Sequence, residues 1–181
     1  ACDTCLDKTY ITLAEDDKVL KSETIVSDGQ NYHSAYLIST IVKVLKELNL
    51  TPKDIDMIAT DIGPGSFTGI RACTTVARVL AQQLDIKAIG VSSLEILSKI
   101  LGAIELEQVD ELVKERTLIT DNSLLERFSQ YTDKALSYQV SDYPLGEILA
   151  KLAYEKAINS EDANWRKLKP LYIQPPPVFG K

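Results

Sequence analysis

A glycine-rich turn, GPGSFTG at residues 63–69, holds the residue types that could most readily bind a ligand. It joins an apolar run to a segment of helical period, so its backbone N–H groups would lie at a helix N-terminus, where phosphate and other anions bind. Its spacing fits neither common phosphate loop, because the P-loop lysine is missing and the third glycine comes one residue too late for a dinucleotide fingerprint. Contact with a ligand and a purely structural turn therefore both remain open.

Few other side chains could do catalysis. His33 is the single histidine, so any Ser-His-Asp or Cys-His arrangement would depend on it, and its place before a predicted helix favours a capping role. Asp3, Asp56 and Asp61 stand at or near predicted strand ends, where α/β sheets place their ligand sites. Asp3 could hold a metal–phosphate group or a water, or it could cap a turn.

The three cysteines lack the spacing of a secreted disulfide framework. Cys2 and Cys5 match C-x-x-C, but a predicted strand follows them, whereas a redox pair needs a helix N-terminus to stabilise its thiolate. Cys73 and His33 would complete a zinc site only at unusual spacing. We expect small buried thiols.

Composition limits the partners of the chain. Its 181 residues carry a net charge of −6 with a pI near 4.9, which argues against a stand-alone nucleic-acid binder. No apolar run is long enough to span a membrane and no signal peptide is visible, so we expect a cytoplasmic protein. Because the chain starts at Ala1 without Met, we also expect residues to be missing there.

The elements around the glycine turn predict an α/β fold. Strands are expected at residues 8–14, 19–27, 57–63, 87–92 and 117–120, and helices at 35–48, 70–84, 93–101 and 144–158. Alternating strands and helices with short turns indicate a parallel, right-handed βαβ sheet.

Helices 35–48 and 70–84 are apolar on more than one side, and Arg71 and Arg78 are the only charged residues of the second. A helix of a two-layer fold normally keeps one polar face. The pattern is that of deeply covered helices or of a protein–protein interface, and the interface is favoured.

The sequence resembles the TsaB (YeaZ) family. The segment from residue 33 to 97 carries GPGSFTG-I-R and, some twenty residues later, GVSSLE; CDTC stands where that family has an Asp-Thr-Ser strand end, and PLYIQ resembles its carboxyl-terminal motif. The resemblance covers residues 1–98 and 142–174. It implies an actin-like ATPase fold (ASKHA, ribonuclease H-like) of two related lobes. These would be an amino-terminal lobe with the interface helices, residues 1–98, and an incomplete carboxyl-terminal lobe with an extended tail, residues 99–181.

The resemblance also implies a function. The family is the non-catalytic partner of TsaD in making N6-threonylcarbamoyladenosine beside the anticodon of tRNAs that read codons starting with A, and the ATPase TsaE joins the two. The chain would be a scaffold that activates TsaD, forms a homodimer when alone and meets tRNA only indirectly. It would have no cofactor of its own beyond weak or interface-shared ATP or ADP with Mg. The alternative is a stand-alone nucleotide-binding ATPase or phosphotransferase of the same fold.

Specific residues follow from the resemblance. No catalytic or metal residue is expected, since Ser93 and Leu97 stand where TsaD has the two histidines of its metal motif. The expected interface comprises Leu37, Ile41, Val44, Leu45, Leu48, Arg71, Thr74, Thr75 and Arg78. A vestigial nucleotide or anion contact would comprise Asp3, Thr4, Asp61, Gly63, Gly65, Ser66 and Gly69. Two features depart from the family: a D-A-R hairpin is not found between residues 101 and 109, and Cys5 replaces the usual serine.

Overall fold

The computed structural model describes residues 1–6, 8–26, 33–101, 118–120, 135–137, 143–159 and 163–172. The chain divides into two compact units, one of residues 1–96 and 145–181 and the other of residues 97–144. The second unit contains a parallel pair of short strands, β6 (Leu118–Thr120) and β7 (Ala135–Ser137). The segment expected to hold the D-A-R hairpin lies outside the described residues.

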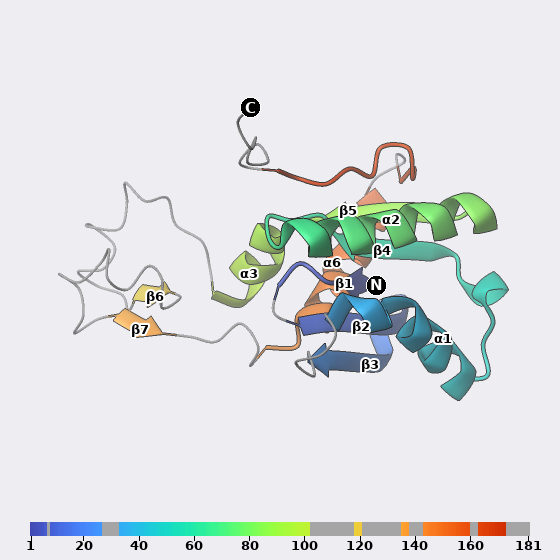
Figure 1. The fold of residues 1–181 in the computed structure, drawn as a ribbon, viewed down its shortest axis with the longest axis horizontal. Helices are drawn as coiled ribbons and strands as arrows, with labels where there is room; N and C mark the ends of the chain where they lie inside the picture. Colours follow the sequence, from blue (N-terminus) through green and yellow to red (C-terminus); the bar gives the residue numbers. More distant parts are fainter. Residues whose placement is uncertain are drawn as a thin grey trace, which may run out of the picture. The chain divides into compact units, whose positions relative to one another are not determined.

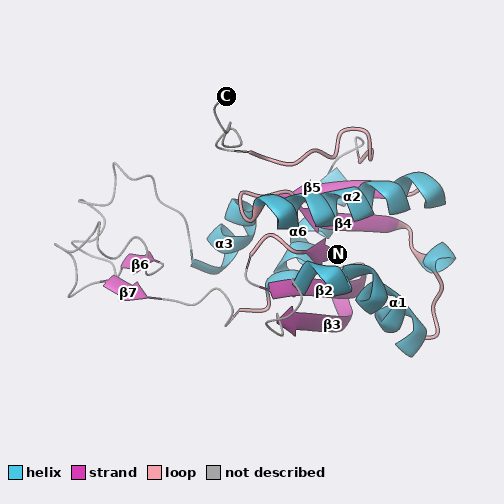
Figure 2. Ribbon diagram, viewed as in Figure 1, coloured by secondary structure: helices cyan, strands magenta, loops and turns pink. Residues whose placement is uncertain are grey.

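A five-stranded mixed sheet forms the centre of the first unit. Its strands are β1 (Cys2–Asp3), β2 (Lys8–Glu15), β3 (Lys18–Val26), β4 (Met57–Asp61) and β5 (Lys87–Val91), in the order β3-β2-β1-β4-β5. The strands β1, β2 and β3 are antiparallel neighbours, whereas β4 runs parallel to both β1 and β5 (Figure 2). The predicted hairpin and βαβ unit are thus both present.

Helices cover both faces of this sheet (Figure 1). The short 3-10 turns are η1 (His33–Tyr36) and η2 (Pro52–Asp54), and the α-helices are α1 (Leu37–Glu47), α2 (Phe67–Leu84), α3 (Ser93–Leu101) and α6 (Leu145–Asn159). Helices α1 and α2 contact one face and α6 contacts the other. Alternation along β2 explains this, because Ile11 packs in the core beneath α1 while Tyr10 and Thr12 face Gly146 of α6.

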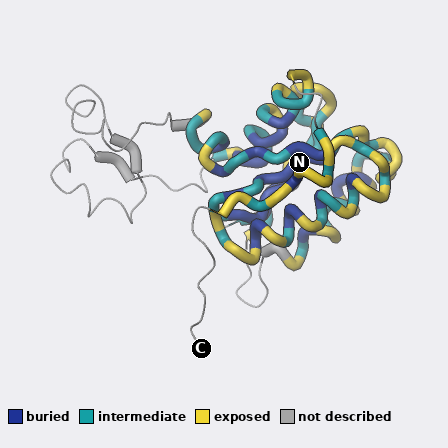
Figure 3. The backbone as a smooth tube through the Cα atoms, turned by 90° about the horizontal axis from the view of Figure 1, so that it is seen from above, coloured by how far each residue is buried: buried dark blue, intermediate teal, exposed yellow. Residues whose placement is uncertain are grey.

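Two apolar cores hold these layers together. Figure 3 shows that buried residues occur in both the strands and the helices of the first unit. The first joins β1 and β2 to α1 and α2 and includes Ile11, Leu37, Val44 and Ile70. The second lies between α2, β4, β5 and the carboxyl-terminal segment, where Leu168 is buried. On the other face, Leu145 and Leu149 of α6 are buried as their spacing indicates, and Leu152 is half-buried.

Two helix starts differ from the sequence expectation. Helix α2 begins at Phe67 rather than residue 70, because Ser66 caps it by accepting a hydrogen bond from the Gly69 N–H at 3.2 Å. Helix α1 begins at Leu37, after a 3-10 turn, and no side-chain hydrogen bond caps it. At its other end Asn49 has a φ of 56°, as expected for a residue that ends a helix.

The division of the chain also differs from the predicted boundary after residue 98. Helix α6 follows that boundary in sequence, yet it packs on β2, β3, β4 and β5 of the first unit. Its apolar face requires a sheet to cover it, and sequence order does not specify which sheet. No helix among the described residues is long and apolar enough to cross a membrane.

The backbone of Thr4 lies close to Gly69 of α2, and a substitution at Gly69 tests this contact. A Cβ added to Gly69 would overlap with the carbonyl of Thr4, so Gly69→Ala should lower the free energy of unfolding by about 3 kcal/mol or more. Alanine normally stabilises a helix by up to about 1 kcal/mol relative to glycine, so the sign of the effect is diagnostic. Urea unfolding measures it, with Gln83→Ala on the exposed side of α2 as the control. A Gly69→Ala protein as stable as the wild type would contradict the packing.

Candidate functional site

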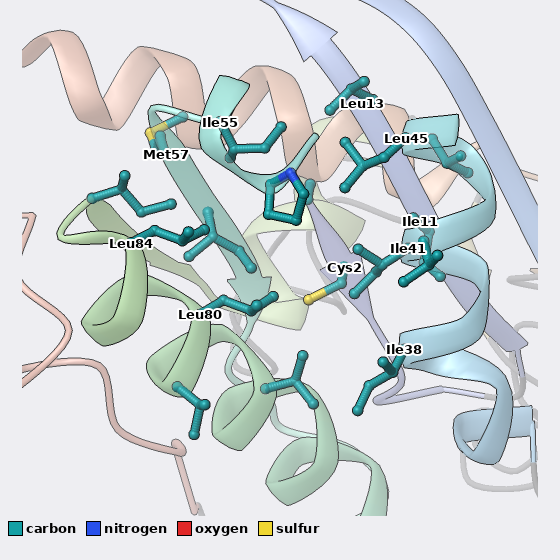
Figure 4. A pocket seen from close by; sticks show the side chains of 18 of the residues that line it. Cys2, Ile11, Leu13, Ile38, Ile41, Leu45, Ile55, Met57, Leu80 and Leu84 are labelled. Atoms are coloured by element: carbon teal, nitrogen blue, oxygen red, sulfur yellow. The ribbon is translucent and has the colours of Figure 1, made fainter. Parts of the chain in front are cut away.

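An apolar groove separates α1 from α2 on one face of the sheet (Figure 4). Its volume is about 390 Å³, and we call it the α1–α2 groove. Cys2, Ile11 and Leu13 of the sheet and Val44 and Leu45 of α1 form one part of its wall. The remaining lining residues, from the sheet, both helices and the segments next to them, are Ala1, Thr12, Ile38, Ile41, Val42, Pro52, Ile55, Met57, Ile58, Thr75, Val76, Val79, Leu80, Leu84 and Ile86. The groove therefore presents almost only apolar side chains.

The predicted interface residues divide into three groups. Leu37, Val44, Leu45 and Thr74 are buried within the chain itself, so none of them is a surface residue. Ile41 and Leu48 are partly buried against the same core. Arg71 and Thr75 are exposed and Arg78 is half-buried.

The predicted interface left out three exposed apolar residues that line the groove. Ile38 and Val42 on α1 are 62% and 42% exposed, and Val79 on α2 is 50% exposed, and all three line the groove. The sequence signal for these three residues was an apolar side chain outside the main apolar face of its helix. The stripe itself, from which the expected residues were drawn, instead packs on the sheet.

The two arginines of α2 contact aromatic rings of their own chain. The Arg71 guanidinium lies 4.8 Å from the ring centroid of Phe67, and that of Arg78 lies 6.0 Å from the ring of Trp165. Tyr172 in turn packs on Phe67, with ring centroids 5.5 Å apart. These contacts fix the carboxyl-terminal segment along α2.

The glycine turn, residues 63–69, is filled by the segment that follows β1. The Ser66 N–H donates to the Cys5 carbonyl at 2.7 Å, and the Thr4 hydroxyl donates to the Gly69 carbonyl at 2.5 Å. A Cβ on Gly65 would overlap with the Cys5 carbonyl. These glycines are explained by the close approach of another backbone.

The two expected carboxylates meet below this turn. Asp3 and Asp61 end the parallel neighbours β1 and β4, and both are fully buried. The Cys5 N–H donates to Asp3 at 2.7 Å, while the Gly63 N–H and the Ser93 hydroxyl donate to Asp61, each at 2.7 Å. Burial raises the pKa of both carboxyls, and the nearby charge of Asp61 raises that of Asp3 further.

The three cysteines are free and buried, as expected. Cys2 lines the groove, whereas Cys5 and Cys73 lie together near the carboxylates, with their sulfurs 3.8 Å apart. Burial raises the pKa of Cys2 to about 12, and the contact with Cys73 raises that of Cys5. Asp3, Cys5 and Asp61 each offer a ligand atom, all within 4.8 Å of one another.

Comparison with solved structures identifies the class of fold. The chain resembles "YeaZ from Pseudomonas aeruginosa", with a TM-score of 0.70 and 19% identity over 95% of this chain and 97% of that chain. A second match, titled an uncharacterized protein with similarity to peptidase YEAZ from Pseudomonas aeruginosa, has a TM-score of 0.74 and 18% identity over 96% and 97%. The α/β fold is thus the YeaZ form of the actin-like ATPase type, which confirms the predicted class.

Comparison of sequences finds relatives among TsaB and TsaD proteins. The model for TsaD, tRNA N6-adenosine threonylcarbamoyltransferase, matches residues 22–109. TsaB of Bacillus subtilis is 34% identical over 84 residues, which are 44% of this chain and 37% of that protein. TsaB of Buchnera aphidicola subsp. Schizaphis graminum is 34% identical over 102 residues, 55% and 46%. The predicted resemblance to the TsaB (YeaZ) family is therefore confirmed, and the matches span less than half the length of these two curated relatives.

The buried carboxylates predict an unusual dependence of stability on pH. Because their pKa values are raised on folding, the folded chain binds more protons than the unfolded chain, and stability should fall as the pH rises above about 4 toward the raised values. In chelator-treated buffer, Asp3→Asn should flatten this loss and stabilise the chain at pH 7. The expected gain is on the order of 1 kcal/mol, the free energy of one pKa unit.

Urea unfolding between pH 4 and 8 measures this effect. Asp56→Asn is the control, because Asp56 is exposed, and it should leave the pH profile unchanged. A wild-type stability that rises steadily from pH 4 to 8 would contradict the assignment.

Proposed function

We propose that the chain is a non-catalytic scaffold subunit in the biosynthesis of tRNA threonylcarbamoyladenosine, which docks TsaD through the α1–α2 groove. The α1–α2 groove is the observation that carries this proposal. The names of the curated TsaB relatives supply the pathway, and the TsaD model that matches residues 22–109 relates this chain to the partner. A cytoplasmic location follows from this role.

The groove has the anatomy of a protein interface. Val44 and Leu45 form part of its wall and are buried. Ile38, Val42 and Val79 also line the groove, and their side chains are exposed. A partner that covers these exposed apolar side chains would gain about 25 cal/mol of binding free energy for each Å² of apolar surface removed from water. The apolar face of a partner helix can pack in such a groove, so the same surface would serve TsaD in the complex and a second copy when the chain is alone.

The side chains near the glycine turn support a non-catalytic role. Ser93, at the place of a TsaD metal histidine, donates its hydroxyl to both oxygens of Asp61, and Leu97 cannot bind a metal at the other place. In the turn itself, the Ser66 N–H already donates to Cys5 and the Gly69 N–H to Ser66. TsaD would therefore supply the nucleotide, the metal and the tRNA contacts, with TsaE joining the pair.

The alternative is a nucleotide-binding ATPase or phosphotransferase, and one observation favours it. Asp3 and Asp61 lie at the carboxyl ends of parallel strands, where α/β folds bind their ligands. Calorimetric titration of the isolated chain with Mg-ATP separates the two functions. Under the scaffold proposal no saturable binding is expected, whereas saturable binding and turnover that disappear in Asp3→Asn would establish the alternative.

Substitution of the groove rim tests the proposed docking. Ile38→Asp places a charge on the rim and should weaken co-purification with TsaD of the same organism, and self-association, at least tenfold. Ile158→Asp on α6 is the matched control, since Ile158 is 65% exposed and lies on another helix of the other face. Thermal unfolding should be unchanged in both variants. If Ile38→Asp retains TsaD as well as Ile158→Asp does, the groove is not the docking surface.

A further inference from the structure

Two carboxylates and two thiols converge at one edge of the sheet, where β1 and β4 end side by side. Asp3 and Asp61 are the last residues of these strands, Cys5 follows β1, and Cys73 lies on α2. All four side chains are buried. A carboxylate oxygen of each aspartate and the sulfur of Cys5 lie within 4.8 Å of one another. Three potential ligand atoms thus share one small volume, and the sulfur of Cys73 lies 3.8 Å from that of Cys5.

One acceptor of this cluster has no donor. Asp3 uses Oδ1 to accept the Cys5 N–H, but its Oδ2 has no hydrogen-bond partner in the described part of the chain, although the residue is fully buried. Within that same part, no lysine or arginine forms an ion pair with Asp3 or Asp61. Leaving a buried polar atom without a partner costs about 1–3 kcal/mol, and more for a charged one. Either a proton on the carboxyl group or a bound cation would therefore stabilise the site.

The separation of the sulfurs indicates which cation would fit. The Sγ atoms of Cys5 and Cys73 are 3.8 Å apart. Two thiolates bound to one tetrahedral zinc at the usual Zn–S distance of about 2.3 Å stand about 3.8 Å apart as well. Thiolate ligands favour zinc-like cations, whereas Mg²⁺ and Ca²⁺ select sites made of oxygen ligands alone.

The oxygen ligands are already oriented by hydrogen bonds. The Ser93 hydroxyl and the Gly63 N–H hold the Asp61 carboxylate at 2.7 Å, and the Cys5 N–H holds that of Asp3. Outer hydrogen bonds of this kind fix the ligands of protein metal sites.

We propose that Asp3, Cys5, Asp61 and Cys73 form a buried structural site for a tetrahedral, thiolate-binding divalent cation of the zinc type. Such a cation would join β1, β4 and α2 beneath the glycine turn. The inference does not rest on the proposed function, since the groove takes no part in it. The competing explanation is a proton that the two carboxylates share, which requires no metal.

Cobalt is the probe for this site, because Co²⁺ substitutes for Zn²⁺ and reports its ligands by colour. The full chain is reduced, unfolded with chelator and refolded with or without Co²⁺, since buried ligands are accessible only before folding is complete. One Co²⁺ per chain is expected, with a near-ultraviolet thiolate-to-cobalt charge-transfer band and the intense visible bands of tetrahedral cobalt. Zn²⁺ should displace it and raise the melting temperature.

Three variants test the ligands. Cys5→Ser, which places the residue expected from the family resemblance, should weaken Co²⁺ binding at least tenfold and reduce the charge-transfer band. Asp3→Asn should weaken binding similarly and abolish the Zn²⁺-dependent rise in melting temperature. Cys2→Ser is the matched control, because Cys2 is a buried thiol of β1 that lines the groove and is not one of the proposed ligands. This variant should bind Co²⁺ as the wild type does.

Several results would overturn the proposal. Refolded wild-type chain that shows no stoichiometric charge-transfer band would favour the shared proton. Undiminished Co²⁺ binding by Cys5→Ser, or equal loss in Cys5→Ser and Cys2→Ser, would remove Cys5 from the site. Circular dichroism of each variant without metal establishes that the compared proteins are folded.

Discussion

The contact between the segment after β1 and the glycine turn is the constraint on which the rest of the structure depends. Gly65 and Gly69 have no Cβ, so the carbonyls of Thr4 and Cys5 can approach the start of α2. Hydrogen bonds from Ser66 to Cys5 and from Thr4 to Gly69 then join the two backbones. This contact fixes where α2 leaves the sheet, and thereby both the carboxylate cluster below the turn and one wall of the groove.

The groove is the surface on which the fold leaves apolar area uncovered. Helices α1 and α2 both pack on the same face of the sheet, and Ile11, which is buried, and Leu13, which is half-buried, line the groove between them. A helix of a two-layer protein usually keeps a polar outer face, and α1 does so only in part, because Lys43 and Lys46 are exposed alongside Ile38 and Val42. Exposure of the apolar side chains at such a rim to water costs free energy, and a partner that covered them would remove this cost.

The carboxylate and thiol cluster has the opposite character, since its groups are polar and its surroundings are closed. Desolvation works against the charges of Asp3 and Asp61, and only the hydrogen bonds to Cys5, Gly63 and Ser93 offset it. A fold that needed only stability would place apolar residues here.

The sequence by itself determined the α/β class, nearly every element of the first unit and the positions of Asp3 and Asp61 at strand ends, but not that these two carboxylates lie together. Local periodicity and turn chemistry are sufficient for such features, as Asn49 after α1 and the strand Met57–Asp61 illustrate. Only the tertiary structure decided what each apolar residue faces. Val44 and Leu45, which are expected at an interface, are buried against the core and also line the groove, and α6 packs on the first sheet despite its place in sequence. The physical reason is that periodicity specifies which side chains avoid water, whereas the packing of distant segments specifies what covers them, as it also brought Cys73 of α2 against Cys5.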